Sequence, residues 1–219
     1  MIEPFALATL LTLGSLGPVP FPCIERPSAP VPVMAVDEDL RALYESGRAY
    51  EDFLANADRR AELWHANTEK SGGIDMELVR RARAVGGTWR FLAVAIPACS
   101  DSVSTIPYLA RLVGMVEGLD MRIVDNSAGR AVMEAHPTPD GRPATPTVVL
   151  LDADWNESGC FIERPPALQT WILENDGVIS SDDIFTQKMA WYAEDSGQQT
   201  LEAIVEMMEA AAHGEVICR

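Results

Sequence analysis

The chain has 219 residues, of which 47% are hydrophobic and 23% are charged, a composition typical of soluble globular proteins. A chain of this length can bury a core without disulfides or metals, and it suits one domain with additions. Its 33 acidic and 17 basic residues give a net charge of −16, which opposes contact with a phosphate backbone and excludes nucleic acid as a partner.

The first 36 residues predict a poorly ordered tail and linker. An apolar run, 5–16, precedes a proline-rich stretch, 17–36. The run is too short to cross a bilayer, and Glu3 stands before it without any Lys or Arg. We therefore expect a cytoplasmic protein with no membrane partner. Export through this run as a signal peptide is the alternative.

Residues 37–87 predict a helical extension. Apolar side chains recur at roughly helical spacing from Leu40 to Trp64, with a break at Gly47. A second short helix follows around Met76 and stops at Gly86 and Gly87.

Residues 88–176 alternate between strand and helix patterns. An apolar run predicts the first strand, and Pro107 predicts a kink in the helix after it. The expected elements are a strand over 89–96, a helix over 103–117, a strand over 121–124, a helix over 128–136, a loop over 137–146, strands over 147–151 and 158–163, and a helix over 166–175.

Residues 177–219 predict two further helices, over 184–193 and 200–212. Their apolar side chains lie at helical spacing, and neither helix carries a chemical motif. Core packing is the commonest role of such a stripe, so we expect these helices to complete the fold.

Cys99 stands between the first predicted strand and the helix that follows. At this junction the backbone N–H groups of the helix are unpaired and the helix dipole is positive. Such a position favours the thiolate form of a cysteine, which is its nucleophilic form. Cys99 is therefore the leading candidate for chemistry.

Three segments in this order resemble the thioredoxin fold. They are the run 91–102 with Cys99, the strand around Met121–Asp125, and the run 144–152 with Thr145-Pro146 before its strand. The chain is most similar to bacterial thioredoxin-family proteins that have helices before the first strand and a Trp-Cys-x-Asp style turn. The resemblance spans about Leu40 to Glu209. It implies an α/β fold, thioredoxin-like, with a mixed central sheet flanked by helices and additional helices at both ends.

The resemblance also implies roles for individual residues. Cys99 matches the nucleophile, and Pro146 matches the cis-proline opposite it. Thr145 would lay its backbone against a substrate, beside the turn formed by Pro97 and Ala98. The second cysteine of a dithiol site is absent, because Ser102 stands at its position. Ser102 could donate a hydrogen bond to a Cys99 thiolate, whereas an inward-pointing Asp101 carboxylate would oppose that thiolate.

Three hypotheses for Cys99 stay open. It could be a monothiol centre that forms mixed disulfides with protein or small-thiol substrates, with glutathione or another small thiol as co-substrate. It could instead pair with a distant resolving thiol, Cys160 or Cys218. In the third hypothesis the cysteine is a remnant, and the groove beside Pro146 serves a non-catalytic binding module. The sequence indicates no resident cofactor and does not give the oligomeric state.

No metal site is expected. The four cysteines and three histidines are scattered without ligand spacing, which also favours a reducing compartment. The segment from Asp152 to Glu163 places oxygen side chains like a calcium loop, but Glu157 stands where the loop needs glycine. A β-turn explains the same residues. Arg164, at the exit of this hairpin, could reach an anionic ligand, but we expect the commoner role, a pair with a surface carboxylate.

Overall fold

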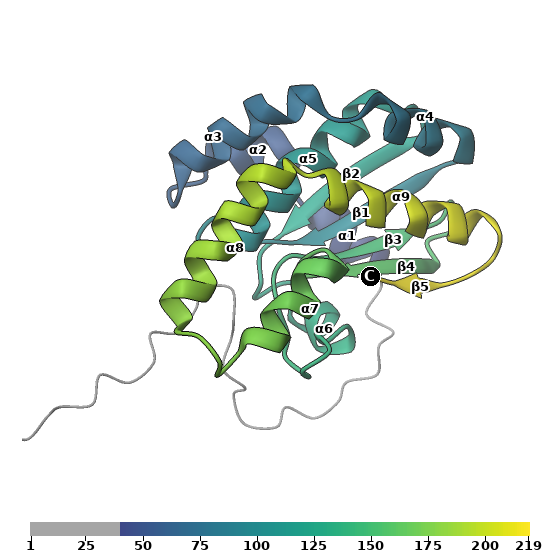
Figure 1. Cartoon of the computed structure of the whole chain (residues 1–219). Helices are drawn as coiled ribbons and strands as arrows, with labels where there is room; N and C mark the ends of the chain where they lie inside the picture. The colour runs from purple at the N-terminus through teal and green to yellow at the C-terminus, as the bar shows by residue number, and fades with distance from the viewer. Residues whose placement is uncertain (1–39) are drawn as a thin grey trace, which may run out of the picture.

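The computed structural model describes residues 40–219, so the predicted tail over 1–36 lies outside the described residues (Figure 1). Strands and helices alternate through the middle of the chain, and helices both precede and follow them. The helices are α1 (Leu40–Ser46), α2 (Tyr50–Ala55), α3 (Ala61–Lys70), α4 (Met76–Val85), α5 (Ser100–Met115), α6 (Arg130–Ala135), α7 (Pro166–Asn175), α8 (Ser181–Asp195) and α9 (Gln198–Ala212), with a 3₁₀ turn over Ser71–Gly73. The strands are β1 (Trp89–Val94), β2 (Leu119–Val124), β3 (Thr147–Leu151), β4 (Glu157–Ile162) and β5 (Ile217–Cys218).

The strands of the described chain form one mixed sheet in the order β2-β1-β3-β4-β5. β1 pairs with β2 in parallel and with β3 antiparallel, and β4 pairs antiparallel with β3 and in parallel with β5. The predicted fold class is confirmed: a mixed α/β sheet is flanked by helices, with additional helices at both ends.

Side chains of successive residues in β1 serve opposite faces of the sheet, as the two-residue period of a strand requires. Phe91 and Ala93 belong to the larger core, which includes side chains of α3, α4, α5 and α9. Leu92 and Val94 belong to the smaller core, together with Tyr44 of α1 and side chains of α6. The sheet is therefore the middle of three layers, as Figure 1 shows. The junction of β1 and α5 therefore lies between the loop before β3 and the helices that pack on the larger core.

Several element ends differ from the sequence prediction by one to three residues, and two differences go further. α5 begins at Ser100 rather than at residue 103, and it continues through Pro107 to Met115. The two-residue strand β5 was not predicted, because so short a segment shows no periodicity. None of the helices described between residues 40 and 219 is long and apolar enough to cross a membrane.

A disulfide joins Cys160 in β4 to Cys218 in β5, with their Cα atoms 4.4 Å apart. The sequence did not predict this pairing, because the four cysteines are widely spaced and mark no disulfide framework. The pairing overturns the hypothesis that either residue is the resolving thiol of Cys99, because each is already bonded to the other. The bond ties the C-terminal strand to the sheet.

Candidate active site

Cys99 occupies the N-cap position of α5, directly after the turn that follows β1. Its backbone is extended (φ −76°, ψ 126°), and its Sγ accepts a hydrogen bond from the Ser102 backbone N–H at 3.3 Å. The same Sγ lies 3.1 Å from the carbonyl oxygen of Thr145, and the Thr145–Pro146 peptide bond is cis. The structure therefore brings together Cys99 and the Thr145-Pro146 pair, which are 46 residues apart in the sequence.

The side chain of Cys99 is fully buried and disulfide-bonded. A nucleophilic thiolate at this position therefore belongs to the reduced protein. Thr145 and Pro146 are buried as well, whereas Pro97 and Ala98 are half-buried.

Ser102 contributes its backbone rather than its hydroxyl. The Ser102 N–H donates to Cys99 Sγ, but the buried Ser102 Oγ makes no hydrogen bond among the described residues. The predicted hydrogen bond from the Ser102 hydroxyl to a Cys99 thiolate stays a prediction, because Cys99 is disulfide-bonded here and its Sγ meets the free N–H of the first helical turn.

Asp101 points into the protein, where its carboxylate is fully buried and neutralised. Lys188 Nζ lies 2.7 Å from its Oδ2, and the Tyr192 hydroxyl donates to its Oδ1 at 2.9 Å. Arg164 Nε lies 3.3 Å from Oδ1. Burial acts to raise the pKa of Asp101, but Arg164 and Lys188 outweigh it, so the pKa lies below its ordinary value. The expected opposition to a Cys99 thiolate is therefore countered by two cations.

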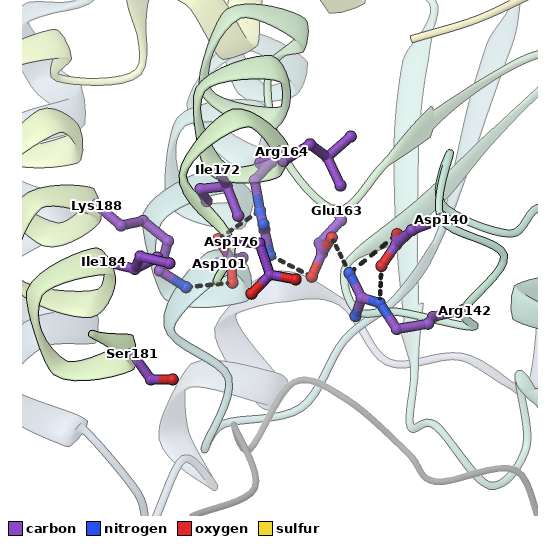
Figure 2. Close-up of a pocket in the computed structure, with 11 residues that line it drawn as sticks. Asp101, Asp140, Arg142, Glu163, Arg164, Ile172, Asp176, Ser181, Ile184 and Lys188 are labelled. Carbon is purple, nitrogen blue, oxygen red and sulfur yellow. Dashed lines mark hydrogen bonds and ion pairs between the residues drawn. The ribbon is translucent and has the colours of Figure 1, made fainter. Parts of the chain in front are cut away.

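Arg164 is buried instead of pairing at the surface as predicted. It is only 5% exposed and contacts both Asp101 and the neighbouring Glu163 (Figure 2). Glu163 is fully buried and has a left-handed backbone (φ 63°), and its N–H donates to the Pro146 carbonyl at 2.7 Å. Burial raises the pKa of Glu163 to about 7, although Arg164 acts in the opposite direction. A carboxyl group that titrates near neutrality thus lies directly beside the cis-proline.

Helix α3 of the N-terminal extension holds the turn before Cys99. Trp64 Nε1 donates to the Pro97 carbonyl at 3.0 Å, and Arg60 Nε donates to the Ala98 carbonyl at 2.7 Å. Trp64 is fully buried. Of the four expected substrate-binding residues, Pro97, Ala98 and Pro146 therefore already have their carbonyl groups hydrogen-bonded within the chain.

Sequence reasoning missed Trp64, Lys188 and Tyr192 as parts of this site. Each lies in a helix that the spacing of apolar residues predicts. That spacing does not predict the hydrogen bond made by the polar end of the side chain. A lysine and a tyrosine four residues apart in a helix, here Lys188 and Tyr192, share one face and could have signalled a buried acidic partner.

The Asp152 carboxylate is held by backbone N–H groups of its own turn. Asp152 Oδ1 accepts hydrogen bonds from the N–H groups of Asp154 and Asn156, so this carboxylate ties the turn between β3 and β4. Across residues 40–219, no three His, Cys, Asp or Glu side chains are grouped as a metal ion would require.

Comparisons with known proteins agree with the fold. A family model described as thioredoxin matches residues 47–182. A crystal structure of a protein of unknown function from Pseudomonas aeruginosa is 19% identical, with a TM-score of 0.62, and the match covers 81% of this chain and 99% of that one. An HIV epitope scaffold is also 19% identical, with a TM-score of 0.60 over 78% of this chain and 97% of the scaffold. No curated protein matches the sequence.

Proposed function

Because the chain belongs to the thioredoxin family, we propose that it carries out thiol–disulfide exchange of the monothiol type through Cys99. The observation that carries this proposal is the position of Cys99 Sγ. It accepts the Ser102 N–H at the start of α5 and lies 3.1 Å from the carbonyl oxygen before the cis-proline. A hydrogen bond to sulfur and the positive end of a helix both favour the thiolate.

The exchange balances with a single cysteine and an external thiol. In the reduced protein, the Cys99 thiolate attacks one sulfur of a substrate disulfide, and the other substrate sulfur leaves as a thiolate. The mixed disulfide on Cys99 is then attacked by the thiolate of a small thiol such as glutathione. That second attack restores the Cys99 thiolate and releases a disulfide between the small thiol and the substrate.

Ser102 has no thiol with which to resolve the mixed disulfide, and Cys160 and Cys218 are bonded to each other. The monothiol proposal therefore takes the attacking thiol from solution, and the disulfide in which Cys99 stands is reduced before exchange begins. Asp101, Lys188 and Arg164 act as positioning residues, because they fix the first turn of α5 while keeping its charge balanced.

A second candidate function is a binding module in which Cys99 is not catalytic. It is favoured by the complete burial of the Cys99 side chain, together with the burial of Thr145 and Pro146. A partner would then be recognised by the half-buried turn of Pro97 and Ala98. The two functions differ in whether the reduced Cys99 exchanges with an added disulfide.

The test uses a variant in which Cys99 is the sole cysteine, with Cys23, Cys160 and Cys218 changed to Ser. The reduced protein, freed of reductant, is exposed briefly to oxidised glutathione and analysed by mass spectrometry. The matched control carries Cys99→Ser in addition, and the wild type is treated in parallel. Circular dichroism verifies that both variants are folded.

The proposal predicts one glutathione adduct on the sole-cysteine variant and none on its control. In the wild type, peptide mapping should find Cys99 either carrying the adduct or returned to its disulfide, because this side chain is disulfide-bonded in the structure. If the folded sole-cysteine variant and the wild type both leave Cys99 unmodified, thiol–disulfide exchange is refuted and the binding module becomes the better account.

A further inference from the structure

Cys99 is disulfide-bonded, and the cysteines of the chain leave one partner for it. The sequence contains four cysteines, which are Cys23, Cys99, Cys160 and Cys218. Cys160 and Cys218 are bonded to each other. Elimination within one chain therefore leaves Cys23, which lies outside the described residues 40–219.

The segment that joins Cys23 to helix α1 is long enough for this bond. Its residues, 24–39, can span at most about 60 Å when fully extended. A folded domain of about 180 residues has a radius of gyration of only about 16 Å. Cys23 can therefore reach the junction of β1 and α5 from wherever α1 begins.

The loop before β3 offers a backbone edge beside Cys99. Ala144 forms a β-bridge, and no strand or isolated bridge within residues 40–219 is its partner. The carbonyl of the next residue, Thr145, lies 3.1 Å from Cys99 Sγ. A β-bridge at Ala144 is the backbone contact expected of an extended segment that lies beside Thr145 and covers the sulfur.

The sequence around Cys23 suits such an edge. Pro22 precedes the cysteine and Pro27 follows it, which favours an extended backbone without internal hydrogen bonds. Phe21 and Ile24 add apolar side chains on both sides of the sulfur. This composition is that of a segment that binds through its main chain and covers apolar surface.

We propose that Cys23 is the disulfide partner of Cys99, and that the segment 21–24 occupies the site beside Thr145 in the oxidised protein. This closed form holds Cys99 in the covalent state of a mixed disulfide, with a segment of its own chain in place of the substrate. It accounts for the complete burial of the Cys99 side chain. Given the proposed exchange, on which this regulation rests, the closed form is inactive until a small thiol opens it.

Opening the closed form consumes two molecules of a small thiol such as glutathione. The first thiolate attacks Cys23 Sγ, the bond to Cys99 breaks, and Cys99 leaves as the thiolate. Cys99 is the better leaving group, because the Ser102 N–H and the positive end of α5 stabilise its thiolate. The second thiolate attacks the mixed disulfide on Cys23 and releases oxidised glutathione. Two electrons thus pass from the two glutathione molecules to the protein disulfide.

Peptide mapping tests the pairing without any exchange activity. The full chain is oxidised with diamide, denatured, treated with iodoacetamide and digested. We expect no alkylated cysteine before reduction, four after reduction, and a crosslinked peptide pair that joins Cys23 to Cys99. The matched control, Cys160→Ser/Cys218→Ser, should keep this pair. If Cys23 is alkylated without reduction, or if Cys99 is crosslinked to a second copy of the chain, the pairing is wrong.

Hydrogen exchange tests where the segment lies. The amide groups of Ala144 and Thr145 should exchange more slowly in the oxidised wild type than in the reduced wild type or in Cys23→Ser. The turn around Asn156 serves as the internal control and should exchange equally in all three. Equal exchange at Ala144 and Thr145 in the oxidised and reduced protein would show that the segment does not occupy this site.

The reaction with oxidised glutathione separates this regulation from the proposed function. Folded Cys23→Ser and the wild type reduced beforehand should both release glutathione, whereas the oxidised wild type should release none. Release by the oxidised wild type at the rate of Cys23→Ser would contradict the closed form. If the peptide pair is found but neither the reduced wild type nor Cys23→Ser reacts, the pairing stands and the proposed exchange is refuted.

Discussion

Lys188 balances the negative charge in the first turn of α5. Its ammonium group contacts the Asp101 carboxylate, and both side chains are shielded from water. Both side chains are at least 95% buried. Lys188→Met removes one partner of a buried pair, which typically costs about 3–5 kcal/mol. We expect a loss of this size in the free energy of unfolding measured by urea denaturation.

The control is Lys70→Met, which changes an exposed lysine that donates to the Ala193 carbonyl and should cost under about 1 kcal/mol. The double variant Asp101→Asn/Lys188→Met should recover part of the lost stability. If the double variant is less stable than Lys188→Met alone, the account of this pair is wrong.

Glu163 makes the stability of the protein depend on pH near neutrality. Its pKa is raised by burial to about 7 in the folded state, from 4.5 when exposed. The proton is therefore held more tightly by the folded chain. The stabilisation is fully present below pH 4.5, and it is lost as the pH rises through 7.

Glu163→Gln removes this titration. Between pH 5 and pH 8, the wild type should lose about 2–3 kcal/mol of unfolding free energy relative to this variant, as the shift implies. Urea denaturation at the two pH values measures it, with exposed Glu174→Gln as the control. If the unfolding free energy changes with pH equally in the wild type and in Glu163→Gln, the raised pKa of the buried Glu163 carboxyl is contradicted.

Among single residues, the sequence predicted those that belong to a recognisable motif. It missed those that reach the site only through tertiary contacts. Cys99 and Thr145-Pro146 stood out from their neighbours. Lys188 did not, because its partner Asp101 is 87 residues away. Arg164 was expected at the surface for the same reason.

Helix α3 is the element that fixes the turn before Cys99. The fully buried Trp64 donates its indole N–H to the Pro97 carbonyl. Trp64→Phe leaves that carbonyl without its donor, and we expect a loss of about 1–3 kcal/mol in unfolding free energy. The same change should alter the rate at which the reduced Cys99 exchanges with oxidised glutathione.

Trp89→Phe is the matched control, since the half-buried Trp89 also donates to a backbone carbonyl, that of Gly86, through an exposed hydrogen bond, and Phe keeps most of its packing. It should change neither stability nor exchange rate appreciably. An equal effect of the two substitutions would show that α3 does not act through this hydrogen bond.

Elements with strong local signals were predicted to the residue. The strand over 147–151 and the helix over 166–175 match β3 and α7. The first turn of α5 was missed because Ser and Asp favour caps and turns when read locally. In the structure, Lys188 of α8 holds Ser100 and Asp101 in that turn, a contact that no local pattern shows.

The disulfide between Cys160 and Cys218 links β4 to the C-terminal strand β5. The two cysteines are 58 residues apart, and the loop between them includes α7, α8 and α9. Crosslinking a loop of this length lowers the entropy of the unfolded chain, which corresponds to about 4 kcal/mol in the chain-entropy model. We expect Cys218→Ala to lower the unfolding free energy by about 2–4 kcal/mol.

The control is Val216→Ala, a change at an exposed neighbour of β5. Cys218→Ala should keep the exchange activity of Cys99, because the bond stabilises the fold and supplies no resolving thiol. An unchanged unfolding midpoint, or a loss of exchange without a loss of stability, would contradict this role.

The layered fold could be predicted from the sequence. Its strand and helix patterns alternate and its first strand is apolar throughout, and few architectures satisfy both conditions. The sequence could not predict the pairing of β5 with β4, because it depends on a contact between residues far apart and has no turn signal. It also could not predict that the cysteine of the site would be enclosed.

The central claim is that Cys99 exchanges thiol for disulfide, and a turnover assay tests it most directly. The reduced protein is supplied with the mixed disulfide of glutathione and 2-mercaptoethanol, with excess glutathione, and formation of oxidised glutathione is followed. We predict that the wild type and Cys218→Ala both accelerate the reaction at least about tenfold over the uncatalysed rate, while Cys99→Ser does not. If the wild type gives only the uncatalysed rate, or if Cys99→Ser is as fast as the wild type, the proposed function is wrong.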